Sequence, residues 1–321
     1  MTRVYRFALA TVLATFALIA VGGLARLQPA GSGCGNDWPR CNGSWLPPLA
    51  WAPLVEYLHR GIALTVIVLT VATALVAFRS PGTPRNVRLF AVAGLAAIVV
   101  QSAIGGVAAR WGAPASIAIL HLTAAMFFLA CAIATLATAA AAQGAPVWLA
   151  ELGRGPSRTA DRAFAVAASL AAAIALILVI FGASTSASGA FACATWPPCA
   201  EVATTVADQT IVHLGYRATA LLGAFATAGT ALLAWRRGAS ATIRAMTSVA
   251  LLLVILQSAL NAIAAVTGDP VWISAPHLVV ATLIWIAMLG VTLAAWGPRP
   301  EPVSGPTAAT TSGSTVAPVH F

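Results

Sequence analysis

Four of the five histidines in this 321-residue chain lie within long apolar stretches, where an ionisable side chain is costly and usually functional. Each lies about five to seven residues after the start of its stretch, which corresponds to a depth of about 8–10 Å in a helix. Imidazoles that face each other across a helix bundle at equal depth suit the axial ligation of a haem iron. The four candidate ligands are His59, His121, His213 and His277.

Three other interpretations of these histidines remain open. A proton relay would need groups staggered through the membrane, with carboxylates among them. A zinc or copper site would need a cysteine, a carboxylate or a third histidine at the same level. A single histidine commonly does no more than hydrogen-bond between helices, but four at one level favour haem ligation.

Glu56 lies one helical turn before His59, and no other Asp or Glu lies more than a residue or two inside an apolar stretch. When Arg60 is aligned with its counterpart in the second half of the chain, Tyr216 stands opposite His59 and His213 stands opposite Glu56. A carboxylate present in one half only indicates that this half carries out chemistry, with Glu56 as a general base. A structural ion pair between Glu56 and Arg60 is the alternative.

Eight apolar stretches must position these groups, and each is long enough to cross a bilayer as a helix. With 60% hydrophobic and 8% charged residues, the chain cannot be a water-soluble globule. The first stretch is longer than the apolar region of a signal peptide, so we expect it to be retained as a helix. The sequence predicts an all-α integral membrane protein in the lipid bilayer, with spans near 7–26, 54–78, 88–109, 116–141, 162–184, 208–235, 244–267 and 271–296.

All 17 basic residues are arginines, and they give the chain a net charge of +9. Twelve would lie on one face of the membrane, three on the other and two inside spans. By the positive-inside rule both termini are predicted to be cytoplasmic, and the histidine level then lies toward the outer face. The charge excess is thereby explained by topology, so no nucleic-acid partner is expected. The tail, which includes His320, is predicted to be disordered.

The chain contains an internal repeat. The Gln-Ser-Ala sequence at 101–103 recurs at 257–259, and His121 recurs as His277, both at an offset of 156 residues. Because each copy has an even number of spans, we expect two tandem four-helix bundles related by a pseudo-twofold axis along the membrane normal. The predicted divisions are an N-terminal half at 1–142, a cytoplasmic linker at 143–161, a C-terminal half at 162–297 and a tail at 298–321.

Four of the five cysteines lie as pairs in two loops of the predicted outer face, each pair spanning a Trp-Pro sequence. Disulfides persist on that oxidising side, and a close turn can bring the thiols of each pair within bonding distance. A structural clip and a redox role both remain open. A zinc site is less favoured because these loops contain no histidine. The pairs are Cys34 with Cys41 and Cys193 with Cys199, and Cys131 is expected to be a small core residue.

Together these residues resemble the haem A synthase family of terminal-oxidase biogenesis. The resemblance rests on Gly33-Cys34-Gly35 followed by Trp38-Pro39-Arg40-Cys41, then Glu56-Tyr57-Leu58-His59-Arg60, then the three further histidines. It implies a bacterial cell-membrane oxidoreductase that oxidises the C8 methyl group of haem O to a formyl group. The chain departs from the family in its second half, where a frequent His-Arg pair is replaced by Tyr216-Arg217.

The resemblance also implies roles for individual residues. The first half would hold the substrate haem O between His59 and His121, with Glu56 catalytic. The second half would hold the cofactor haem b between His213 and His277. The first cysteine pair would act in the reaction or in electron removal, and the second would be structural. We further expect arginine contacts to the haem propionates from Arg60 and Arg217.

Two other functions stay open on the sequence alone. A di-haem electron-transfer cytochrome would need the four histidines, but neither Glu56 nor the outer cysteine pairs. A haem transporter or chaperone would exchange one haem rapidly. A haem O synthase is the partner that the family resemblance implies, and a homo-oligomer is compatible with the sequence.

Overall fold

The computed structural model describes residues 3–28, 33–35, 37, 40–111, 114–154, 162–187, 207–267 and 271–296. Side chains at 183–187, 207–213, 265–266, 271–272 and 274 lie outside this description. The described chain is helical, with one isolated bridge between Cys41 and Ser44. Eight of its helices are long and apolar enough to cross a membrane, which confirms the predicted all-α membrane protein.

The helix ends lie within four residues of the predicted spans. Long helices persist here because leucine, alanine, valine and isoleucine continue without polar interruption, and the bilayer leaves no other way to satisfy the backbone. The spanning helices are α1 (Arg3–Arg26), α2 (Trp51–Arg79), α3 (Arg85–Trp111), α4 (Ala115–Gln143), α6 (Arg162–Ala187), α7 (Ala207–Arg236), α8 (Ala241–Thr267) and α9 (Val271–Trp296).

One short helix, α5 (Val147–Arg154), lies in the segment predicted as a linker. The preceding helix α4 ends at Gly144, whose φ of 68° is left-handed and suits glycine. The Pro146 carbonyl then accepts the first backbone hydrogen bonds of α5. The new helix buries Leu149 and Leu152 and contacts α4 and α9. Eight residues are too few for hydrophobic periodicity to show such a helix reliably.

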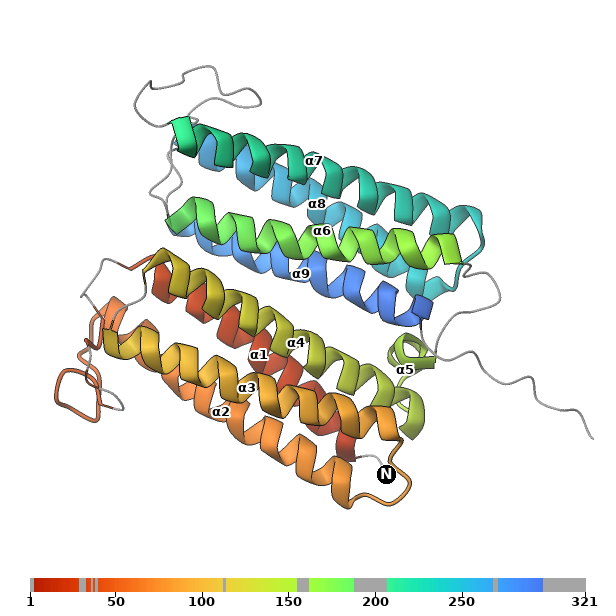
Figure 1. Cartoon of the computed structure of the whole chain (residues 1–321), viewed down its shortest axis with the longest axis horizontal. Helices are drawn as coiled ribbons and strands as arrows, with labels where there is room; N and C mark the ends of the chain where they lie inside the picture. Colours follow the sequence, from red (N-terminus) through yellow and green to blue (C-terminus); the bar gives the residue numbers. More distant parts are fainter. Residues whose placement is uncertain are drawn as a thin grey trace, which may run out of the picture.

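The spanning helices form two groups that follow the order of the chain. Figure 1 shows α1–α5 together in the lower part of the view and α6–α9 in the upper part. Within the first group α2 and α4 each contact both α1 and α3, and within the second α7 and α9 each contact both α6 and α8. The histidine-bearing helices of each group therefore lie diagonally across it. The groups meet where α4 contacts α6 and α9, and where α1 contacts α9.

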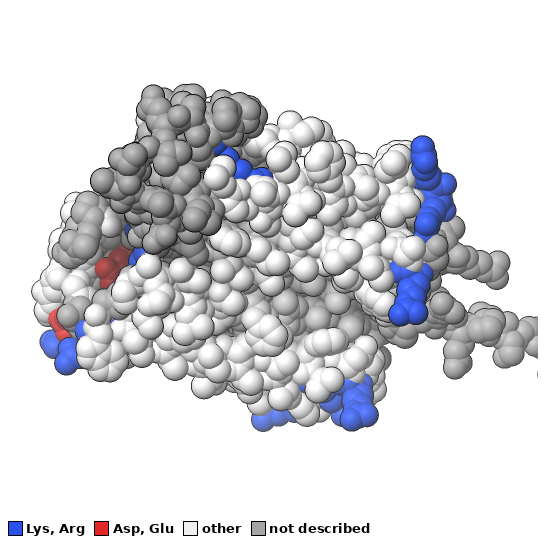
Figure 2. All heavy atoms as spheres, turned by 45° about the horizontal axis from the view of Figure 1, so that its top comes forward, with Lys and Arg blue, Asp and Glu red and all other residues white. Residues whose placement is uncertain are grey.

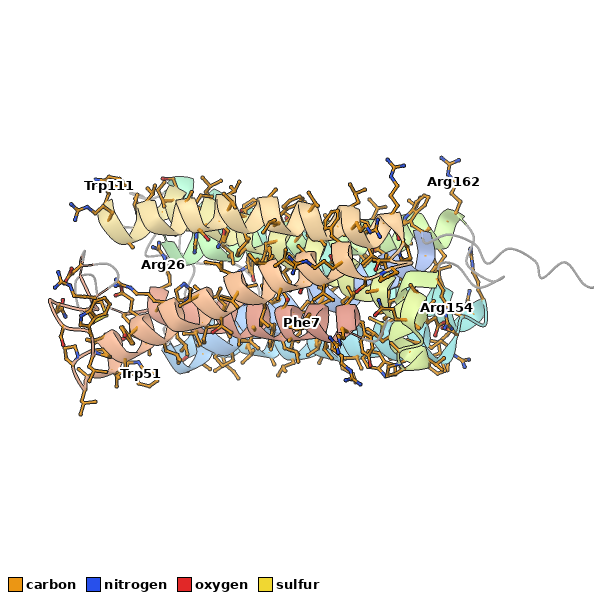
Figure 3. The ribbon with its side chains drawn as sticks, turned by 90° about the horizontal axis from the view of Figure 1, so that it is seen from below. Phe7, Arg26, Trp51, Trp111, Arg154 and Arg162 are labelled. Carbon is orange, nitrogen blue, oxygen red and sulfur yellow. A yellow bond between two sulfur atoms is a disulfide. The ribbon has the colours of Figure 1, made fainter. Side chains whose placement is uncertain are left out.

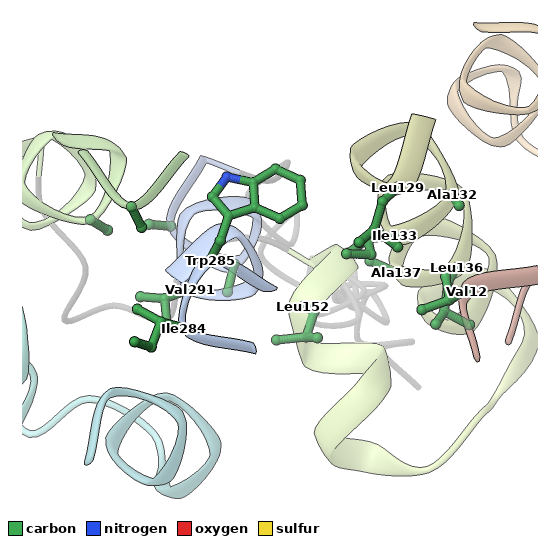
Figure 4. Packing of buried hydrophobic residues seen from close by; sticks show 14 of the residues in the cluster. Val12, Leu129, Ala132, Ile133, Leu136, Ala137, Leu152, Ile284, Trp285 and Val291 are labelled. Carbon is green, nitrogen blue, oxygen red and sulfur yellow. The ribbon is translucent and has the colours of Figure 1, made fainter. Parts of the chain in front are cut away.

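The largest buried cluster joins the two groups. Figure 4 shows Trp285 and Ile284 of α9 on one side, Leu129 and Ile133 of α4 on the other, and Leu152 of α5 between them. In lipid the apolar tails give no net hydrophobic drive for such contacts, so close packing and hydrogen bonds must supply it. Within the first group, threonines also contribute, because the hydroxyls of Thr11 and Thr73 lie 3.1 Å apart between α1 and α2.

On the face visible in Figure 2, charged side chains lie near the helix ends. Figure 2 shows arginine side chains gathered near the two ends of the visible face, with largely uncharged surface between them. In Figure 3 Arg154 and Arg162 lie at one end, and Trp51, Trp111 and Arg26 lie at the other. Tryptophans at a helix end are typical of a membrane–water interface.

Candidate functional site

An ion pair links Glu56 and Arg60 near the N-terminal end of α2. The two residues are one helical turn apart, and Arg60 Nη2 donates to Glu56 Oε1 at 2.6 Å. The Arg60 side chain is 13% exposed and the Glu56 side chain 30%, so the pair is partly shielded from solvent. The structural ion pair that the sequence left open is therefore present. It engages only one of the two carboxylate oxygens.

The loop between α1 and α2 holds the rest of this pair in place. The backbone N–H of Cys34 donates to Glu56 Oε2 at 2.8 Å. On the other side the Arg60 guanidinium donates to three loop carbonyls, those of Gly35 at 3.4 Å, Asp37 at 3.2 Å and Arg40 at 2.8 Å. The loop thus lies over the carboxylate as a lid of backbone groups. In this structure the Arg60 guanidinium contacts Glu56 and the loop carbonyls. The predicted contact between Arg60 and a haem propionate therefore stays a prediction.

A disulfide between Cys34 and Cys41 closes this loop, which confirms the first predicted pair. Both cysteines are fully buried, and the backbone N–H of Asn42 donates to the Cys34 carbonyl at 3.3 Å. Because the Cys34 N–H donates to Glu56, the disulfide restrains the loop and also the position of the Glu56 carboxylate. Cys193 and Cys199 lie outside the described residues, so their pairing stays a prediction. Cys131 is free and buried, as expected.

Gly33 makes the close approach of loop and carboxylate sterically feasible. A Cβ atom at this position would overlap Glu56 Oε2. The Gly33 carbonyl in turn accepts a hydrogen bond from Asn42 Nδ2 at 3.2 Å. Any larger residue at 33 would displace Glu56 from beneath the loop. Gly33 had no predicted role beyond the family pattern, because the requirement for glycine depends on a contact with a residue 23 positions away.

His59 lies on α2, one turn beyond Glu56, and its ring packs against α1. A Cβ atom at Gly22 would lie only 2.9 Å from His59 Cε1, so the glycine is what admits the imidazole. The ring nitrogen Nδ1 is buried, and no partner among the described residues meets full hydrogen-bond geometry, although the Leu18 backbone lies close enough to interact with the ring. The side chain is close enough to His121, Glu56 and Arg60 to interact electrostatically with each.

His121 on α4 has the same kind of environment. A Cβ atom at Gly105 of α3 would lie 3.1 Å from its Cε1 atom. Its Nε2 atom lies 3.2 Å from Nε2 of Gln101, whereas its Nδ1 atom is buried without a partner in the described part of the chain. The carbonyl oxygen Oε1 of Gln101 is likewise buried and unpaired there. Gln101, Gly22 and Gly105 were not among the predicted site residues, although Gln101 marked the repeat.

The second group of helices places His277 of α9 opposite α7. The Tyr216 hydroxyl and His277 Nε2 lie 3.1 Å apart, within hydrogen-bond distance. Gly182 of α6 faces the tyrosine ring, because a Cβ atom there would lie 3.9 Å from Tyr216 Cε2. The side chain of His213 lies outside the described residues, so the predicted pairing of His213 with His277 stays a prediction. The predicted propionate contact of Arg217, which lies on α7, is also not tested.

These features fit a haem. Buried polar atoms are almost always hydrogen-bonded, so the buried Nδ1 atoms of His59 and His121, which meet no partner at full hydrogen-bond geometry in the described ranges, make these rings candidates for binding a group outside the chain. The two histidines belong to diagonal helices, and glycines make room for both rings. Within the described ranges, no three His, Cys, Asp or Glu side chains cluster as a zinc or copper site would require. Imidazole pairs suit axial ligation of a haem iron better.

The fold and these sites define a multi-pass helical membrane protein with buried imidazoles on diagonal helices and a carboxylate held beside one of them. A family model described as cytochrome oxidase assembly protein, COX15-CtaA, matches residues 5–54 and 50–289. This chain belongs to that family, which confirms the resemblance to haem A synthases.

Individual relatives agree with this assignment. The chain is 34% identical to the haem A synthase of Bacillus licheniformis over 111 residues, which is 35% of this chain and 36% of that protein. It is 32% identical to the haem A synthase of Geobacillus kaustophilus over 116 residues, which is 36% of this chain and 37% of that protein. The matched segments thus span little more than a third of these relatives.

Proposed function

We propose that this chain is a haem A synthase that oxidises the C8 methyl group of haem O to a formyl group. The change from methyl to aldehyde removes four electrons overall, through two hydroxylations and the loss of water. The observation that carries the proposal is the position of Glu56, a shielded carboxylate one turn from His59 and fixed by both Arg60 and Cys34. Neither an electron-transfer cytochrome nor a haem carrier has a use for this arrangement.

Glu56 is suited to accept a proton from the reacting methyl or from an attacking water. Its two oxygens each receive one hydrogen bond, from Arg60 and from the Cys34 N–H. Each oxygen of a carboxylate has two lone pairs, so both retain acceptor capacity. A carboxylate acts as a general base in its ionised form. The loop backbone keeps the carboxylate oriented, so little reorganisation is needed at the moment of transfer.

His59 and His121 are the proposed ligands of the substrate haem O. They stand on α2 and α4, which lie diagonally across the first group of helices. This placement would bring the porphyrin into the interior of the group, with its edge beside the Glu56 carboxylate. The Gln101 amide nitrogen is a donor, so its contact with Nε2 of His121 would be replaced when that ring nitrogen binds iron.

The second group of helices is proposed to hold haem b, with His277 as one ligand. When bound, haem b supplies a one-electron redox centre that can take up electrons from the oxidation. The chain contributes the ligand, the apolar surroundings and the connection between the groups. That connection is the interface of α4 with α6 and α9, where the buried side chains form one continuous cluster.

We further propose that the halves are tandem four-helix bundles related by a pseudo-twofold axis along the membrane normal. The repeated diagonal arrangement of α2 with α4 and of α7 with α9 supports this relation. The enzyme would lie in a bacterial cell membrane with both termini cytoplasmic and the Glu56 loop outside. Arg154 and Arg162 lie at the opposite end from that loop, as the positive-inside rule requires. A haem O synthase is the proposed source of substrate.

Replacing the carboxylate tests the proposal directly. Glu56→Gln should lower the conversion of haem O by roughly 10²–10⁴-fold, the usual contribution of a general base. Bound haem O should be retained, since His59 and His121 are untouched. The measurement is mass analysis of haems extracted from the purified protein after co-expression with a haem O synthase.

Glu151→Gln, an acidic-residue change in α5 at the other end of the molecule, is the matched control and should convert haem O normally. Full conversion by Glu56→Gln would show that the general-base assignment is wrong. Loss of all bound haem O in that variant would instead make Glu56 a binding residue.

A further inference from the structure

Tyr216 occupies, in the second group of helices, the position that His59 occupies in the first. Each residue directly precedes an arginine on the second helix of its group. Each ring faces a glycine on the first helix, Gly22 for His59 and Gly182 for Tyr216. Sequence alignment of the halves and side-chain packing therefore agree on the same equivalence.

Tyr216 also contacts His277, which is the residue that a haem ligand on α7 would lie opposite. Its hydroxyl lies 3.1 Å from Nε2 of His277. Since α7 and α9 each pack on α6 and α8, this contact crosses the interior of the group from one diagonal helix to the other. In the first group, Nε2 of the equivalent histidine is contacted by Gln101. In the second, Oε1 of the equivalent Gln257 is buried and has no hydrogen-bond partner among the described residues.

The chemistry of the pair suits haem iron. A tyrosine phenolate is an established axial ligand of ferric haem, as in catalase, and histidine is the axial ligand in globins and peroxidases. A phenolate stabilises the ferric state more strongly than an imidazole does, because it carries a negative charge. A His/Tyr pair would therefore give the second haem a lower reduction potential than two histidines would.

We propose that Tyr216, and not His213, is the α7 ligand opposite His277 at the second haem. This inference rests on the proposed function only in assuming that the second group binds a haem. His213 stands one helical turn before Tyr216 on the same face of α7, so the two residues are the competing candidates. A ferric iron bound between Tyr216 and His277 would replace the hydrogen bond that now joins them, and the phenol proton would be released as the oxygen–iron bond forms.

Four variants of the full-length protein separate the candidates: Tyr216→Phe, Tyr216→His, His213→Ala and His277→Ala. Each is purified with its haems, and the ferric form is examined by electron paramagnetic resonance, resonance Raman scattering and redox titration. Tyr216→Phe should remove the phenolate–iron vibrations and convert the second haem to a five-coordinate, high-spin form. Tyr216→His should give a six-coordinate, low-spin haem with a raised potential.

His213→Ala should leave the ferric spectrum of the second haem unchanged, whereas His277→Ala should lose that haem. The opposite pattern, in which His213→Ala alters the spectrum and Tyr216→Phe does not, would overturn the assignment. A wild-type protein that binds no haem in its second half would instead contradict the proposed function. Tyr216→Phe keeps the ring and its packing against Gly182, so a change confined to the iron spectrum cannot come from misfolding.

Discussion

At the scale of single residues, the site is defined as much by missing side chains as by present ones. His59 and His121 each fit only because a glycine stands opposite the ring, at Gly22 and at Gly105. Gly33 allows the loop to rest on Glu56 in the same way. The imidazoles are thereby held at fixed positions, and one nitrogen of each meets no partner at full hydrogen-bond geometry in the described chain. Such preorganisation is what a cofactor or substrate site requires.

The two adjacent glycines of α3 offer a matched test of this idea. Gly105→Ala would place a Cβ atom 3.1 Å from His121 Cε1, whereas Gly106→Ala would meet nothing within 4 Å. Both changes alter the helix propensity equally, so only the contact differs. Gly105→Ala should weaken retention of the first-half haem by roughly 10-fold, the scale at which displaced outer-shell groups alter metal affinity. The haem-to-protein ratio after purification measures this, and equal ratios for the two variants would refute the steric role.

Much of the site at this scale was predictable from the sequence. The histidines and Glu56 stood out because ionisable side chains in apolar stretches are rare. Gly22 and Gly105 did not, because glycine is common in membrane helices and its role depends on a ring from another helix. Tyr216 was noticed only as a departure from the family. Its contact with His277 depends on the packing of diagonal helices, which no local pattern encodes.

At the scale of elements, the loop between α1 and α2 belongs to the framework of the proposed active site. It contributes one N–H to Glu56 and three carbonyls to Arg60, and its own fold is closed by the Cys34–Cys41 disulfide. The long helices around it were predicted to within four residues at each end. The lid formed by the loop was not, because backbone hydrogen bonds to α2 leave no signature in side-chain types.

Removing the disulfide should loosen this lid. The double variant Cys34→Ser/Cys41→Ser should lose on the order of 2 kcal/mol of stability, as expected for a short closed loop. Conversion of haem O should fall roughly tenfold or more, because the charge-assisted bond from the Cys34 N–H is no longer held in place. Cys131→Ala, at the buried free cysteine, is the control and should leave both quantities nearly unchanged.

Thermal unfolding in detergent and haem O conversion provide the two readouts for this variant. A double variant with an unchanged unfolding midpoint and no turnover at all would point to a redox role instead. If neither the unfolding midpoint nor the conversion of haem O changed, the disulfide would have neither a structural nor a redox function.

At the scale of the whole molecule, the two groups of helices carry different polar side chains at equivalent positions. The first has a pair of histidines and the loop-bound Glu56, whereas the second pairs His277 with Tyr216 and has no counterpart of Glu56. A buried cluster that includes Trp285 and Leu129 fastens the groups together. The repeat was visible in the sequence, and the division of labour follows from where the repeat fails. Substrate oxidation is assigned to the first group and electron acceptance to the second.

The most direct test of the account is the identity and number of haems in the purified wild-type chain. The protein would be co-expressed with a haem O synthase, and its extracted pigments quantified and identified by mass. The account predicts two haems per chain, one of them haem b and the other haem O or its hydroxylated or formyl product. A colourless protein, or one that carries only haem b at both positions, would contradict it.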